Sequence, residues 1–162
     1  METTANLGLT NIWNVTCLDS NGNVKWAEEK KNLITTVGLN HILDTQFHAG
    51  TAVTTWYIGL KGAGTPAAGD TMASHATWSE ITDYSGDRKE WTEGAASAGS
   101  MTNASSVDFS INGTATIAGA FLNTAATGTA GTLYGVVDFA SARSVISGDT
   151  LQVTVTVTAA SA

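Results

Sequence analysis

The segment from residue 150 to residue 158 is the feature that most restricts the fold of this chain. Its sequence, TLQVTVTVT, places an apolar side chain at every second position, with Gln or Thr at the positions between them. Successive side chains of a β-strand point to opposite faces, so one face of this strand is apolar and the other is polar. Such a strand belongs to a sheet with one buried side and one side in water. The rest of the chain must therefore supply partner strands and a second apolar layer.

The composition of the whole chain favours β-structure as well. Charged residues make up 13% of the 162 residues, which is about half of the usual share. Hydrophobic residues make up 43%, and the chain contains 17 glycines. Small, uncharged, β-tolerant residues with many turn formers are typical of a packed β-protein, whereas a helical protein would contain more Glu, Lys and Leu.

Turn residues divide the chain into further expected strands. The pair Asn21-Gly22 predicts a two-residue hairpin turn in which both residues have positive φ. Residues 94–104, GAASAGSMTNA, are expected to form a draped connection without a strand. We expect strands at residues 11–18, 23–28, 55–61, 78–83, 89–95, 105–111, 115–123, 132–139 and 150–158.

One short α-helix is expected near residues 36–48. Thr35 or Thr36 can cap its first turn, and Gly50 can end it. Apolar side chains recur at the spacing i, i+3, i+4 and i+8, which places them on one helical face. These residues are Leu39, Ile42, Leu43 and Phe47. We expect this face to pack against a sheet, because Gly38 and Asn40 are poor helix formers and the helix needs that support.

These elements predict an all-β fold, an antiparallel β-sandwich with one short helix. The strand order is expected to be jelly-roll-like, with an immunoglobulin-like order as the alternative, because both use short alternating strands. We expect residues 1–10 to form a flexible N-terminal arm and residues 11–162 to form a single sandwich domain.

The charge of the chain argues against several classes of partner. The formal net charge is −7, and the seven Lys and Arg residues are scattered along the sequence. Without a basic stripe, such a surface repels nucleic acid and anionic membranes, so we expect neither as a partner. The first ten residues, METTANLGLT, lack the basic and apolar regions of a signal peptide, and no apolar stretch has the length of a membrane span.

Isolated histidines and one cysteine give little support for a metal site. His41 and His48 are two helical turns apart, roughly 10 Å along the axis, which is too far for one ion without other ligands. His75 would join them only if its loop folded back. Cys17 lies in the middle of an expected strand, where it is expected to be a small buried hydrophobe rather than a nucleophile. We expect no metal, no cofactor and no catalytic residue.

The loop at residues 62–77 and the charged turn that follows it are the expected protein contacts. The loop follows the apolar run WYIGL and contains the single proline of the chain. Long loops on small scaffolds often carry function, and GAGTPAAG lacks the spacing of a phosphate-binding loop. The candidate contact residues are Thr65, Pro66, Asp70, Met72, His75, Asp87, Arg88 and Lys89.

The segment WSEITDYSGDRKEWTE leaves two alternatives open. Its aromatic residues Trp78, Tyr84 and Trp91 would stack on sugar rings if they were exposed in one groove. Its dense carboxylates would support glycoside hydrolysis if two of them converged in a cleft with a raised pKa on one. Acidic residues on the wet face of a sheet are ordinary, so a solvated or protein-binding face is the simpler interpretation.

Nearly the whole chain resembles a family of small structural proteins of tailed bacteriophages. The resemblance starts at NVTCLDSNGNVKWAEEKKNLITTVGLNHILDTQFHAG and continues through TTWYIGLKG and GDTMASHATWSEITDYSG. It then extends from WTEGAASAGSMTNASSVDFSINGTATIAGAFL to SGDTLQVTVTVT. In character these segments are similar to capsid decoration proteins, also called cement proteins, which coat the outside of an icosahedral head.

The resemblance implies a protein that is made in the cytoplasm of a bacterial host and ends on the outer capsid surface of the virion. There it would clamp neighbouring subunits of the major capsid protein, as a dimer or trimer of itself. No catalytic motif carries over from such a family, which implies that the chain is not an enzyme. The alternative is a module of the tail or fibre that binds carbohydrate on the host receptor.

Overall fold

The computed structural model describes residues 7–161, which form two antiparallel sheets packed face to face and one helix. The expected all-β sandwich is therefore confirmed. The elements are β1 (Leu7–Leu18), β2 (Val24–Lys31), β3 (Leu33–Ile34), α1 (Thr36–Phe47), β4 (Trp56–Lys61), β5 (Glu80–Ile81), β6 (Lys89–Trp91), β7 (Ser100–Thr102), β8 (Val107–Ser110), β9 (Ala115–Asn123), β10 (Leu133–Val145) and β11 (Thr150–Ser161).

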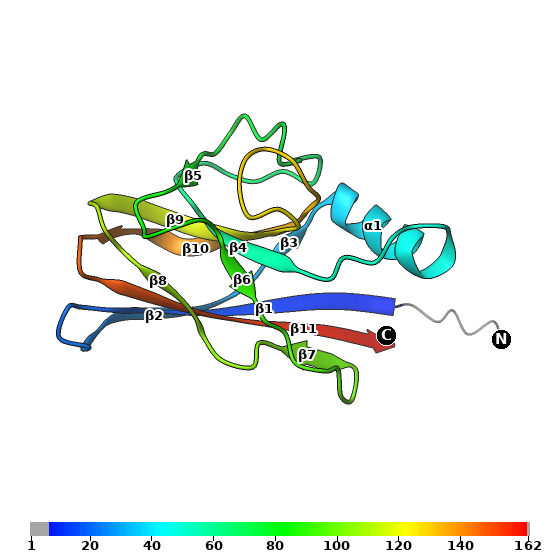
Figure 1. Cartoon of the computed structure of the whole chain (residues 1–162), viewed down its shortest axis with the longest axis horizontal. Helices are drawn as coiled ribbons and strands as arrows, with labels where there is room; N and C mark the ends of the chain where they lie inside the picture. The colour runs from blue at the N-terminus through cyan, green and yellow to red at the C-terminus, as the bar shows by residue number, and fades with distance from the viewer. Residues whose placement is uncertain (1–6, 162) are drawn as a thin grey trace.

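Sheet A has the order β2-β1-β11-β7, and β8 pairs with another part of β11. Sheet B has the order β3-β10-β9-β4-β5, and β6 also pairs with β4. The two sheets form the two layers of the molecule, and α1 lies at the end where β1 begins and β11 ends (Figure 1). The first and last strands of the domain are therefore neighbours in the middle of sheet A.

The alternating pattern of β11 has the expected effect. Leu151, Val153 and Val155 are fully buried between the sheets, and they pair across the ladder with Cys17, Val15 and Trp13 of β1. β9 and β10 lack this simple alternation of apolar and polar residues. The loop that contains Met72 and Trp78 covers the outer side of sheet B and buries that face as well. A strand that is covered on both faces has an almost continuous apolar sequence.

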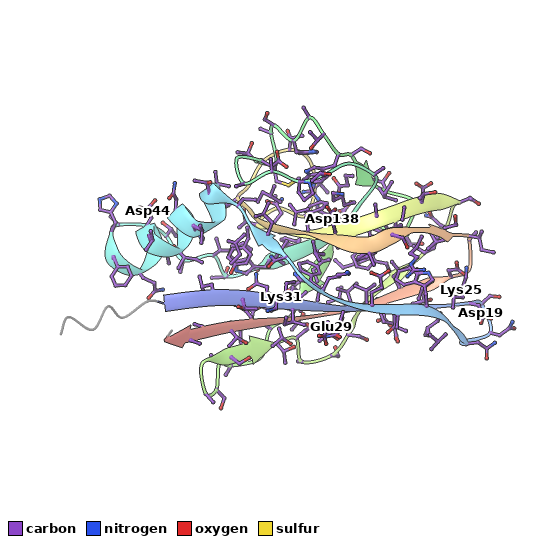
Figure 2. The ribbon with its side chains drawn as sticks, turned by 180° about the vertical axis from the view of Figure 1, so that it is seen from behind. Asp19, Lys25, Glu29, Lys31, Asp44 and Asp138 are labelled. Atoms are coloured by element: carbon purple, nitrogen blue, oxygen red, sulfur yellow. The ribbon has the colours of Figure 1, made fainter. Side chains whose placement is uncertain are left out.

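The outer edge of sheet A is formed by β2, whose exposed positions include three charged residues beside the apolar Val24 and Ala27. Lys25, Glu29 and Lys31 follow one another along this strand on the rear side of the molecule (Figure 2). Charged side chains on an edge strand oppose pairing with another chain. This edge is therefore poorly suited to adding a strand from a partner.

Three details of the expected strands are wrong. β1 begins at Leu7, so residues 7–10 are not a flexible arm but pair with the end of β11; residues 1–6 lie outside the described residues. The connection at residues 94–104 contains β7, which pairs with β11. In the hairpin after β1 only Gly22 has a positive φ, because the Asp19 side chain accepts hydrogen bonds from the backbone N–H groups of Asn21 and Asn23 and shapes the turn.

Helix α1 has the expected bounds, but it is rotated relative to the expected packing face. Thr35 caps it by accepting a hydrogen bond from Gly38 N at 3.1 Å, and Gly50 N bonds to Asp44 O just after the last turn. Gly38 lies so close to β10 that a Cβ there would come within 2.3 Å of Tyr134 O. Adjacent helical residues are about 100° apart around the axis, so seating Gly38 on β10 turns Leu39 outward.

We predict that Gly38→Ala destabilises the protein although Ala is the better helix former. Ala gains about 1 kcal/mol over Gly inside a free helix, but here the new methyl group collides with backbone that cannot move aside, at a cost of about 2 kcal/mol or more. Urea unfolding followed by tryptophan fluorescence measures the difference. The matched control is Asn40→Ala at an exposed position of α1, which should raise the stability slightly. If Gly38→Ala is also stabilising, the helix does not contact β10 in this way.

Candidate functional site

The exposed apolar side of α1 is the strongest candidate for a functional surface. Leu39, Leu43 and Phe47 have exposed fractions of 42%, 55% and 83%. Together they account for half of the six large hydrophobic side chains that are exposed among the described residues. They are spaced four residues apart, which places them along one side of a helix. We refer to these three residues as the helix surface.

The helix surface is held rigidly from the opposite side of α1. Thr35 is fully buried, and its hydroxyl donates to Leu133 O while its backbone N bonds to Tyr134 O at 3.0 Å. Ile42 packs partly buried against the main core. His41 lies edge-on to Trp56 with 5.7 Å between the ring centres. The exposed side chains are therefore presented by a helix that is already fixed before any partner binds.

The expected contact loop is largely occupied with its own packing. Met72 is fully buried in a small cluster with Trp78 and Phe121 on the outer side of sheet B. Asp70 is also buried, and its carboxylate accepts hydrogen bonds from Trp78 Nε1 at 2.8 Å and from Ala67 N at 2.9 Å. Interpreting Asp70 and Met72 as contact residues is therefore wrong, because both side chains fasten the loop to the domain.

A buried lysine fixes the root of the same loop. Lys61 has no exposed surface, and its ammonium lies 2.7 Å from Asp138 Oδ1 and 3.0 Å from Gly62 O. The Lys61 side chain reaches β10 by passing over Gly119 of β9. A Cβ atom on Gly119 would lie 3.3 Å from Cδ of Lys61. Nothing in the sequence around Lys61 signals this role, because the pairing depends on three strands that are distant in the chain.

Arg88 is the third expected contact residue that is buried. Its Nε and Nη2 atoms donate to the two Glu80 oxygens at 2.8 and 2.7 Å, and Nη1 donates to Ala125 O at 2.9 Å. Nη2 also lies 2.7 Å from Gly128 O. Four of the five N–H groups of this guanidinium are bonded to β5 and to the loop after β9, and the side chain is buried, so its assignment as a contact is wrong.

The remaining five contact candidates keep exposed surface. Thr65 and Asp87 are exposed, while Pro66, His75 and Lys89 are partly exposed. His75 stacks on Trp78 with ring centres 3.9 Å apart, and Lys89 Nζ lies over the Tyr84 ring. The structure does not gather these residues into one patch with the helix surface.

The aromatic residues expected to bind sugar are all buried. Trp78 belongs to the loop cluster, Tyr84 packs edge-on against Phe109, and Trp91 Nε1 donates to Asn103 Oδ1 at 2.9 Å. Their exposed fractions are 5% or less. The proposed stacking platform is therefore wrong: Trp78 packs into the loop cluster, whereas Tyr84 and Trp91 belong to the main core.

The acidic site that the sequence leaves open as an alternative gains no support from the geometry, and neither does a histidine metal site. Both oxygens of Glu80 are bonded to Arg88. Within residues 7–161, no group of three or more His, Cys, Asp and Glu side chains could hold a metal ion. In the same part of the chain, no helix has the length and apolar character needed to cross a membrane.

Comparison with known proteins adds no relative: no family model matches the chain, and no curated protein matches its sequence.

We predict that Cys17 does not react with thiol reagents in the folded protein. It is fully buried, and burial, together with the nearby Asp149 carboxylate, raises the pKa of its thiol to about 11. At pH 8 the reactive thiolate is therefore scarce as well as shielded. Labelling with a disulfide reagent at pH 8 should be at least 100-fold slower than in denaturant. Ser20→Cys, which adds a thiol in the exposed hairpin turn, is the control and should react at once.

We predict that Arg88→Lys lowers the free energy of unfolding by about 3 kcal/mol, because one ammonium cannot replace the forked contacts to Glu80 and two carbonyl groups. Asp87→Asn, one residue earlier and exposed, should change stability by less than about 0.5 kcal/mol. Chemical denaturation measures both variants. Equal stability of the two would show that the Arg88 contacts are dispensable.

Proposed function

We propose that this chain is a capsid decoration protein of a tailed bacteriophage, which binds the outer surface of the assembled head. In this proposal the partner is the major capsid protein, and the contact is the helix surface of Leu39, Leu43 and Phe47. The sequence resemblance to small virion structural proteins supports the choice of partner. The exposed apolar helix is the structural observation that carries the choice of surface.

The helix surface has the properties of a protein contact. Apolar side chains that protrude from a soluble domain cost solubility, and a cluster of them commonly marks an interaction site. An amphipathic helix that lays its apolar side into a groove is a common recognition mode. Because α1 is fixed by Thr35, Gly38 and Ile42, little conformational entropy is lost when a partner binds.

The remainder of the fold suits a clamp on a lattice. The domain is a sandwich whose edge strand β2 exposes three charged side chains, and these disfavour strand pairing between copies at that edge. A protein that binds only the assembled lattice stabilises that lattice by mass action. Binding as a dimer or trimer would raise the avidity for neighbouring capsid subunits without any new contact on each copy.

The test is co-sedimentation of the purified chain with heads of the parent phage that lack it. We expect the natural chain to bind, and we expect Phe47→Ser to bind at least 10-fold more weakly. The melting temperature of this variant should not fall, because the Phe47 side chain is 83% exposed. The matched control is Gln46→Ser, the neighbouring exposed position of α1, which should bind like the natural chain.

Three outcomes would contradict the proposal. If the natural chain does not sediment with heads, it is not a decoration protein. If Phe47→Ser binds as well as the natural chain, the helix surface is not the contact. If light scattering shows that Phe47→Ser breaks a dimer of the free chain while head binding persists, a second copy covers the helix surface. Electron cryo-microscopy of the virion would then locate the true contact, or place the chain on the tail.

A further inference from the structure

An apolar cavity that is open to solvent on one side lies at the end of the sandwich, beneath α1. Its volume is about 180 Å³. Sheet B contributes Trp56, Trp91 and Tyr134, sheet A contributes Leu9 and Val157, and α1 contributes Ile42. This is the end of the molecule where β1 starts, β11 finishes and the helix lies across the opening (Figure 1). Side chains from two sheets and a helix meet there without filling the space between them.

The size and the walls of the cavity restrict what can enter it. An apolar cavity of about 150 Å³ in another protein stays dry and binds benzene, so this volume accommodates a single six-membered ring. Three of the lining residues are aromatic, and aromatic rings favour offset or edge-on contact with another ring. All residues that line the cavity are uncharged, so the wall offers an ionised ligand no opposite charge to compensate for the hydration that it loses.

A buried amide lies behind the cavity wall, where it contacts Tyr134. Asn11 is 1% exposed and lies on β1 between Leu9 and Trp13, opposite Val157 of β11. Its Oδ1 atom is 3.5 Å from the hydroxyl of Tyr134, a residue of the cavity wall. Its Nδ2 atom is buried without a hydrogen-bond partner. A buried donor that is left unpaired costs about 1–3 kcal/mol, and a ligand acceptor would remove that cost.

We propose that the cavity is a binding site for a small, neutral, single-ring aromatic molecule that carries one hydrogen-bond acceptor. The ring occupies the space between Trp56, Trp91 and Tyr134, and the acceptor meets Asn11 Nδ2. This site is separate from the helix surface: Ile42 points to the cavity wall, whereas Leu39, Leu43 and Phe47 are exposed. The inference does not depend on the proposed function.

The test is a titration of the full chain with phenol, benzene and benzoate, followed by amide NMR shifts. Phenol and benzene should both shift residues that line the cavity, and phenol should bind about 3- to 10-fold more tightly, as one added hydrogen bond allows. Benzoate should bind far more weakly than benzene, because the uncharged wall offers its carboxylate no compensating partner. Absence of these shifts with phenol and benzene, or equal binding of benzoate, would overturn the proposal.

Two variants distinguish the contribution of the aromatic ring to binding from the contribution of the hydrogen bond to Asn11. Asn11→Leu keeps the approximate shape of the side chain and should abolish the preference for phenol over benzene while both still bind. Val157→Phe fills the cavity from β11 and should abolish the binding of both, without loss of the folded spectrum, because Phe is well accepted in strands. If Val157→Phe does not fold, the benzoate comparison and Asn11→Leu still decide the question. A preference for phenol that persists in Asn11→Leu, or binding of either ligand that persists in folded Val157→Phe, counts against the assigned site.

Discussion

The pairing of β1 with β11 is the interaction on which the rest of the structure depends. It joins the two ends of the domain in one antiparallel ladder that runs from Leu7 opposite Ser161 to Leu18 opposite Thr150. All other strands of sheet A pair with one of these two strands. Its inner face, with Trp13, Val15 and Val155, forms one wall of the core. Because this contact spans nearly the whole chain, sheet A cannot be completed before the last strand is in place.

The same ladder explains why both candidate sites lie at one end of the molecule. The beginning of β1 and the end of β11 supply Leu9 and Val157 to the cavity, while sheet B supplies Trp56 and Tyr134. α1 lies across this opening and is seated on β10 through Gly38. A helix that covers the end of a sandwich buries only one narrow side. The remaining apolar side chains must therefore stay in water or contact another molecule.

The candidate surface could be predicted from the sequence only in part. The i, i+3, i+4 and i+8 pattern correctly indicates a helix with apolar residues on one side, but it cannot say which side faces the domain. The close approach of Gly38 to Tyr134 O sets the rotation of the helix, so Ile42 packs inward while Leu39, Leu43 and Phe47 stay exposed. The charged and polar residues of the loop region are misread for a similar reason. Asp70 and Arg88 look like surface groups, but Trp78 Nε1 donates to the Asp70 carboxylate, and Arg88 donates to carbonyl groups of residues 125 and 128, which are distant in the chain.

The sequence by itself determined the fold class, the capped helix and the inward face of β11, because each depends on a local period or a local hydrogen bond. The burial of Cys17 in a strand also follows from the sequence, because apolar and polar residues alternate around it. Only the tertiary structure decided which apolar residues stay exposed, which polar residues are buried and where a cavity remains. These outcomes depend on the angle at which the helix meets β10 and on the gap between two sheets. Both quantities are set by contacts between residues far apart in the chain, and no local pattern encodes them.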